Sequence, residues 1–158
     1  MSIDIIVELS KNCSGVVSVK EGSTLFMKGA CCSAEPVKLD LDIMKQSSGV
    51  AAVADAAERA QRSTALLAYA AFAGGKVCSN AFIHAAMTGK YVLQAAPAAV
   101  GAMLCGAEGK TAAAGMFPGS AWVDYCTPGV ILAEKVRLTN ANVVFAANYA
   151  LFVLADTP

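Results

Sequence analysis

The stretch "STALLAYAAFAGGKVC", Ser63 to Cys78, decides the predicted fold, because its first thirteen residues carry no charge and few large side chains. Just before it, four charged residues between positions 55 and 62 recur with helical spacing and give one solvated face. Past Arg62 that face ends, although helical composition continues to Gly74. A helix that is apolar all round must be covered all round, by lipid, by its own core or by another chain.

Composition sets the classes of partner to consider. The chain has 158 residues and zero formal net charge, with 15% charged, 56% hydrophobic and 7% aromatic residues. Only Lys76 and Lys90 are charged between positions 63 and 107, and there is no basic patch, so no nucleic-acid partner is predicted from charge. Copies of such a chain repel one another little, which favours self-association.

The first 45 residues predict a small antiparallel β region. Four short segments, rich in Val, Ile and Leu, are separated by turn residues, and they span 3–9, 15–20, 23–29 and 37–44. The last one alternates apolar and charged residues, as a strand with one wet face does.

The remainder predicts an Ala-rich, mainly helical body. One helix begins at Ser47 or Ser48, a second spans "SNAFIHAAMTGK", and a third is interrupted at Pro97. A further strand is expected near 129–138, and the final apolar segment is left open as a helix or a pair of strands. The predicted fold class is therefore α+β in a single domain, 1–158, with a β-rich part over 1–45 and a mainly helical part over 46–158.

No catalytic, cofactor or metal motif is complete. The segment "GAEGKTAAAG" resembles the end of a phosphate-binding P-loop, but Leu104 stands where that loop needs its first glycine. His84, the one histidine, is interpreted as a core residue, and one histidine with scattered cysteines argues against zinc. We therefore predict no catalytic residue, cofactor, metal or small-molecule substrate.

The N-terminus and the cysteines indicate synthesis in a cytoplasm. Asp4 and Glu8 interrupt the first apolar stretch and no basic region precedes it, so it does not read as a signal peptide. The six cysteines show no metal-binding spacing and are expected to be small, buried and reduced. We also consider that the protein is released from the cell as part of an assembled particle.

These features together predict a structural role. A membrane span needs about 20 apolar residues, and the stretch from Ser63 ends after thirteen. Because a chain of this size cannot hide all its uncharged surface, we predict a non-enzymatic, coat-like subunit that assembles with other copies of itself into a filament, tube, sheet or shell. The alternatives are a membrane-embedded or lipid-binding helical protein and a small-ligand or nucleotide-binding enzyme. The predicted assembly interface consists of Ala68, Ala71, Phe72, Ala98, Ala102, Gly106, Phe145 and Phe152.

Overall fold

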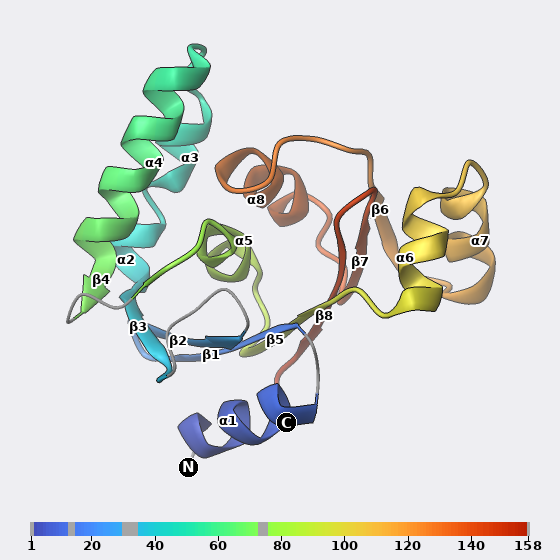
Figure 1. Cartoon of the computed structure of the whole chain (residues 1–158), viewed down its shortest axis with the longest axis horizontal. Coiled ribbons are helices and arrows are strands. Elements are labelled where there is room, and N and C mark those ends of the chain that lie inside the picture. Colours follow the sequence, from blue (N-terminus) through green and yellow to red (C-terminus); the bar gives the residue numbers. More distant parts are fainter. Residues whose placement is uncertain (1, 13–14, 30–34, 73–75, 158) are drawn as a thin grey trace.

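The computed structural model describes residues 2–12, 15–29, 35–72 and 76–157. Within them, eight strands form one sheet in the order β4-β3-β2-β1-β5-β8-β7-β6 (Figure 1). The strands are β1 (Val16–Glu21), β2 (Thr24–Gly29), β3 (Val37–Asp40), β4 (Ala71–Phe72), β5 (Tyr91–Ala95), β6 (Ala121–Val123), β7 (Val143–Ala146) and β8 (Ala150–Ala155). Neighbouring strands run antiparallel, except that β6 and β7 are parallel.

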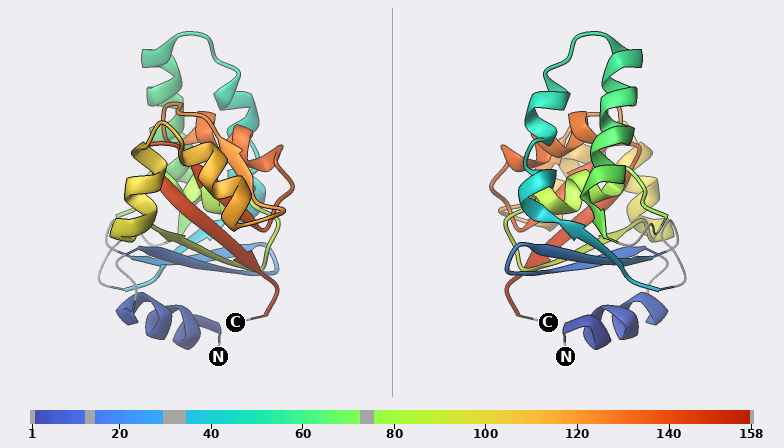
Figure 2. Two further views of the ribbon diagram at one scale, coloured as in Figure 1. Left: turned by 90° about the vertical axis from the view of Figure 1, so that its right-hand side faces the viewer. Right: turned by 90° about the vertical axis from the view of Figure 1, so that its left-hand side faces the viewer.

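Helices cover both faces of this sheet (Figures 1 and 2). They are α1 (Ser2–Asn12), α2 (Leu41–Met44), α3 (Ser47–Ala51), α4 (Ala56–Ala70), α5 (Asn80–Ala86), α6 (Ala98–Cys105), α7 (Gly109–Met116) and α8 (Val130–Arg137). The main core lies between the sheet and α5 and α8, where Phe82, Leu132 and Phe152 are buried. Smaller clusters lie under α1, around Ile6, and under α6 and α7, around Leu104.

Strand β1 sends alternate side chains to these two layers, as the period of a strand requires. Val17 and Val19 join the cluster under α1. Ser18 points the other way, since its hydroxyl bonds to His84 on α5, and Lys20 reaches the end of the same helix. This alternation puts two polar side chains of one strand against α5.

The predicted division into an N-terminal β region and a helical body is wrong, because strands occur along the whole chain and make a mixed α/β fold. Residues 130–137, expected as a strand, form α8, where Leu132, Ala133 and Val136 are buried at helical spacing. Residues 3–9, also expected as a strand, lie in α1, an eleven-residue helix that buries Ile6 and exposes Leu9.

Five strands, β4 to β8, lie in the part of the chain predicted to be mainly helical. Residues 91–95, expected to be helical, form β5 between β1 and β8. The final segment, left open between a helix and strands, is the hairpin of β7 and β8. The turn of this hairpin contains Asn148, which has a positive φ of 54°. The helix predicted over "SNAFIHAAMTGK" is confirmed as α5, but it ends at Ala86, and Pro97 precedes the first turn of α6.

The stretch from Ser63 lies mainly in α4. This helix begins after Asp55, whose side chain accepts a hydrogen bond from the Glu58 backbone amide. Glu58 and Arg62, two of the charged residues predicted to share a solvated face, form an ion pair at 2.6 Å. Of the residues of α4 that follow Arg62, only Leu66 and Ala70 are buried, whereas Tyr69 is 74% exposed. No helix in the described ranges is both long and apolar enough to cross a membrane.

Candidate functional site

A cavity of about 480 Å³ lies at the end of β1 and α5, beside α2, α3 and α8. We call it the Lys20 cavity. Its polar lining includes Lys20, Lys45, Ser48, Thr88, Glu134 and Arg137, and the buried side chains of Leu41 and Met44 supply apolar wall. The site thus joins residues from five separate elements and from the turn after α5.

Lys20 is the most enclosed cation of this cavity. Its ammonium group donates a hydrogen bond to the carbonyl of Met87, the residue that ends α5. Burial lowers the pKa of Lys20 from 10.5 to about 8. Among the described residues no carboxylate pairs with it, so no opposite charge stabilises the ammonium form. At neutral pH about a tenth of such amines are uncharged, a far larger share than for an exposed lysine.

The other charged groups lie nearer the solvent. Glu134 accepts a hydrogen bond from the Ser48 hydroxyl and another from the Arg137 guanidinium at 2.8 Å, and these bonds lower the pKa of the Glu134 carboxyl. Glu134 is therefore ionised at neutral pH. Lys45 pairs with Asp42 at 2.7 Å at the surface. Three cations and one carboxylate line the cavity, so its balance of charge favours an anionic ligand.

A chain of buried polar side chains runs along the other side of α5. Ser18 Oγ lies 2.7 Å from His84 Nδ1, and His84 Nε2 lies 3.3 Å from Gln94 Oε1. Since Gln94 Oε1 can only accept, Nε2 carries the proton and Nδ1 accepts from Ser18. Burial, with a smaller contribution from the charge of Lys20, lowers the pKa of His84 to about 4. The imidazole is therefore neutral at pH 7, and the prediction of a satisfied core histidine is confirmed.

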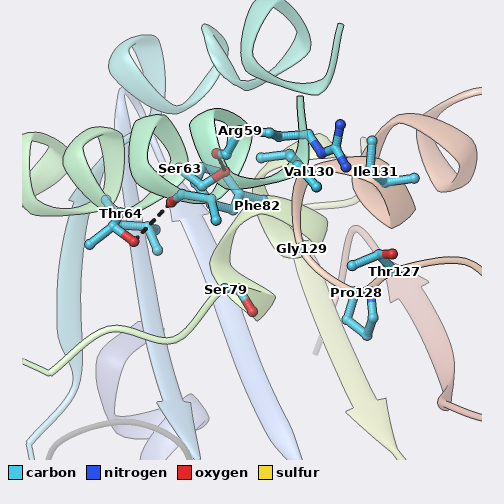
Figure 3. A pocket seen from close by; sticks show the side chains of 13 residues that line it. Arg59, Ser63, Thr64, Ser79, Phe82, Thr127, Pro128, Gly129, Val130 and Ile131 are labelled. Atoms are coloured by element: carbon cyan, nitrogen blue, oxygen red, sulfur yellow. Dashed lines mark hydrogen bonds between the residues drawn. The ribbon is translucent and has the colours of Figure 1, made fainter. Parts of the chain in front are cut away.

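A second cavity, of about 340 Å³, lies between α4, the start of α5 and the segment that enters α8 (Figure 3). Figure 3 shows Arg59 and Ser63 on one side of it and Thr127 on the other. Arg59 donates to the carbonyls of residues 53 and 54, and the Ser63 hydroxyl bonds to the Arg59 carbonyl at 2.8 Å. This cavity, which we call the Arg59 groove, has one cation already engaged by the backbone and is the poorer site for an anion.

The predicted assembly residues do not form one surface. Phe145 and Phe152 are fully buried, the first under α6 and α7 and the second in the main core, where its ring meets His84 edge-on. Ala71 is partly buried, and the exposed members are Ala68, Phe72, Ala98, Ala102 and Gly106.

The other chemical candidates are scattered. The partial P-loop falls at the first turn of α7, where Lys110 lies 3.7 Å from Asp124. In the part of the chain that the structure describes, no three His, Cys, Asp or Glu side chains lie close enough to hold a metal ion. Cys105 and Cys126 are free and Cys78 is disulfide-bonded, whereas the pair Cys31–Cys32, like Cys13, falls outside the described residues.

The Lys20 cavity was not predicted from the sequence. Lys20 is two residues after Ser18, so the strand period already placed both on one face. Glu134 and Arg137 are spaced by three residues, as neighbours on a helix are. However, residues 129–138 were interpreted as a strand, which hid that relationship.

Comparison with known proteins shows the fold. No family model and no curated protein matches the chain. The N-terminal class II aldolase domain of a conserved Thermoplasma acidophilum protein superposes with a TM-score of 0.81 over 99% of this chain and 85% of that one, at 15% identity. YgbL of Klebsiella pneumoniae, a putative aldolase/epimerase/decarboxylase, gives 0.61 over 98% and 76%, at 14% identity.

A third structure, an aldolase II superfamily protein from Pseudomonas syringae, gives a TM-score of 0.56 at 13% identity. It matches 94% of this chain, which spans 61% of its length. The chain therefore has the class II aldolase fold. The predictions of a coat-like, non-enzymatic subunit are overturned, because the solved structures that share this fold are described as class II aldolase and aldolase/epimerase/decarboxylase proteins.

Proposed function

We propose that this chain is an enzyme that breaks, forms or inverts a bond next to the carbonyl group of a small anionic compound bound in the Lys20 cavity. The names aldolase, epimerase and decarboxylase, attached to one protein of the same fold, describe reactions that share one feature. Each can proceed through a carbanion beside a carbonyl group. A site for such chemistry must hold the carbonyl compound and stabilise that negative charge.

The observation that supports this proposal most directly is the convergence of Lys20, Lys45 and Arg137 on one cavity with a single carboxylate. Its volume of about 480 Å³ falls in the range of small-molecule sites. The amine of Lys20 is the enclosed group, and Arg137 is half exposed. A ligand would thus direct its carbonyl inward and its anionic group toward Arg137, whose planar guanidinium suits carboxylate or phosphate.

Ligand-dependent melting tests the proposal. Pyruvate and dihydroxyacetone phosphate are the anionic probes, and acetone and dihydroxyacetone are their uncharged counterparts. A ligand at a hundred times its Kd stabilises the folded state by about 2.7 kcal/mol, which raises the melting temperature of a domain of this size by several degrees. We expect such a rise with at least one anionic probe and none with its counterpart.

Two variants on α8 locate the anionic group. Arg137→Gln removes the cation that lines the cavity, whereas Lys135→Gln removes an exposed cation of the same helix that does not line it. The melting shift should be lost in the first variant and kept in the second. Equal shifts in both variants, or no shift with either anionic probe, would count against this function.

A further inference from the structure

We propose that Lys20 is the catalytic nucleophile of this site and that its amine forms an imine with the carbonyl carbon of the bound compound. This inference rests on the proposed function, which places that compound in the Lys20 cavity. It assigns a covalent role to one residue and a metal-independent route to the reaction.

The chemistry needs an electron sink. A carbanion beside a carbonyl is stabilised either by a metal ion on the oxygen or by an iminium group formed with a lysine. The metal route needs a cluster of ligating side chains, and the described residues hold no group of three His, Cys, Asp or Glu that would serve. The donor set present in the Lys20 cavity therefore fits an amine better than a metal.

The surroundings of Lys20 meet the requirements of a nucleophilic amine. Partial burial lowers its pKa to about 8, which supplies uncharged amine at neutral pH. Among the described residues it makes no ion pair, so no carboxylate stabilises the ammonium form. His84, the buried histidine nearby, is neutral and adds no charge. The hydrogen bond to the Met87 carbonyl fixes the nitrogen at the cavity wall.

A purely structural role is the competing explanation for the same contact. An ammonium group near the end of a helix can bond to its last carbonyls and interact favourably with the helix dipole. In that case an arginine would serve as well as a lysine at position 20. A guanidinium cannot lose its proton in a protein and forms no imine, so Lys20→Arg separates the two roles.

The neutral amine attacks the carbonyl carbon and forms a C–N bond, while the carbonyl electron pair moves to oxygen. Nitrogen loses a proton, oxygen gains protons from solvent, and water leaves to give the iminium. A bond next to that carbon then breaks, and its electron pair enters the iminium to give an enamine. The departing group leaves without the pair, as an aldehyde, carbon dioxide or a proton.

Protonation of the enamine carbon and hydrolysis by water complete the cycle and return the amine. Glu134 is the carboxylate among the cavity's lining residues, and Arg137 and Ser48 keep it ionised. It is therefore our candidate for the base that accepts the proton from the departing group. Arg137, which pairs with Glu134, binds and positions the substrate.

Borohydride reduction of the imine tests the inference. The folded wild-type protein is incubated with pyruvate at pH 7 and reduced with sodium borohydride, and the modified peptide is identified by mass spectrometry. We expect one dominant adduct on Lys20. Lys20→Arg should lower the adduct at least tenfold, whereas Lys135→Arg, on α8 but outside the cavity lining, should leave it unchanged. The yield at Lys20 should rise with a midpoint near pH 8.

The results of this experiment distinguish failure of the imine from failure of the proposed binding site. Adducts spread over exposed lysines, or full adduct yield in Lys20→Arg, would overturn the imine. Binding of pyruvate without any adduct would overturn it too, while the proposed binding site would stand. If pyruvate neither binds nor reacts, and dihydroxyacetone phosphate behaves in the same way, both proposals fail. The wild-type peptide map decides the case even if Lys20→Arg does not fold.

Discussion

The side chains of Ser18 and His84, 66 residues apart in the chain, meet at 2.7 Å in the interior of the protein. This contact joins β1 to α5. The same strand and helix also meet two residues further along β1, where Lys20 bonds to the carbonyl that ends α5. The buried polar contact therefore helps to set the position of the amine that we propose as the nucleophile.

Removal of the Ser18 hydroxyl should destabilise the protein. Ser18→Ala leaves His84 Nδ1 without a donor in the core, and a buried unsatisfied group costs about 1–3 kcal/mol. Ser23→Ala, in the exposed turn after β1, should change the free energy of unfolding by less than about 0.5 kcal/mol. Urea denaturation measures both, and equal values for the two variants would contradict the account of this contact.

The neutral, buried state of His84 predicts a loss of stability in acid. Its pKa is about 4 in the folded protein and about 6.5 in the unfolded chain, so between these values the unfolded state binds more protons. The contribution of neutral His84 to the free energy of unfolding is complete above pH 6.5 and decreases as the pH falls toward 4. The loss is about 2 kcal/mol at pH 5 and reaches about 3 kcal/mol below pH 4. Lys20 is protonated in both states over this range and adds no slope.

The variant His84→Gln isolates this effect. The acidic side chains titrate in the variant as in the wild type, so a difference between the two proteins reports the histidine alone. Urea denaturation at pH 7 and pH 5 gives the change in unfolding free energy for each. We expect the wild type to lose about 2 kcal/mol more than the variant between these two values. Parallel losses would show that His84 does not carry the acid sensitivity.

Two glycines of α7 should respond in opposite directions to alanine. A Cβ at Gly109 would lie 1.9 Å from the Met103 carbonyl oxygen, whereas a Cβ at Gly115 would meet nothing within 4 Å. Gly115→Ala should stabilise the helix by about 0.5–1 kcal/mol, since alanine is the better helix former. Gly109→Ala should destabilise the protein, because backbone must move to admit the methyl group. Thermal melting of both variants checks the sign, and stabilisation by Gly109→Ala would contradict the packing of α6 on α7.

The parts of the fold that were predicted correctly are those with local signals. The short strands β1 and β2 and the start of β3 are separated by turn residues, and α5 has both a start and a stop signal. In contrast, β5 consists of "YVLQA" followed by alanines, and its strand partners Val16–Val19 and Leu151–Ala155 are distant in the sequence. Because sheet pairing is non-local, composition near position 91 could not distinguish a strand from a helix.

The candidate site was beyond sequence reasoning for a similar reason. Lys20, Glu134 and Arg137 are ordinary surface residue types, and more than a hundred residues separate the first from the other two. No motif spacing connects them. Only the pairing of β1 beside β5 and the packing of α8 on α5 bring them to one cavity. Because no charged residue lies near position 70, we predicted a helix that is covered on all sides. In the structure, α4 buries mainly Leu66 and Ala70.

The location of the ligand site is tested most directly by amide chemical-shift mapping with isotope-labelled protein and pyruvate or dihydroxyacetone phosphate. We expect the perturbed amides to gather around Lys20, Thr88 and Arg137 and to reach saturation at the same ligand concentration. Perturbations centred on the Arg59 groove, or none that saturate with either probe, would contradict it.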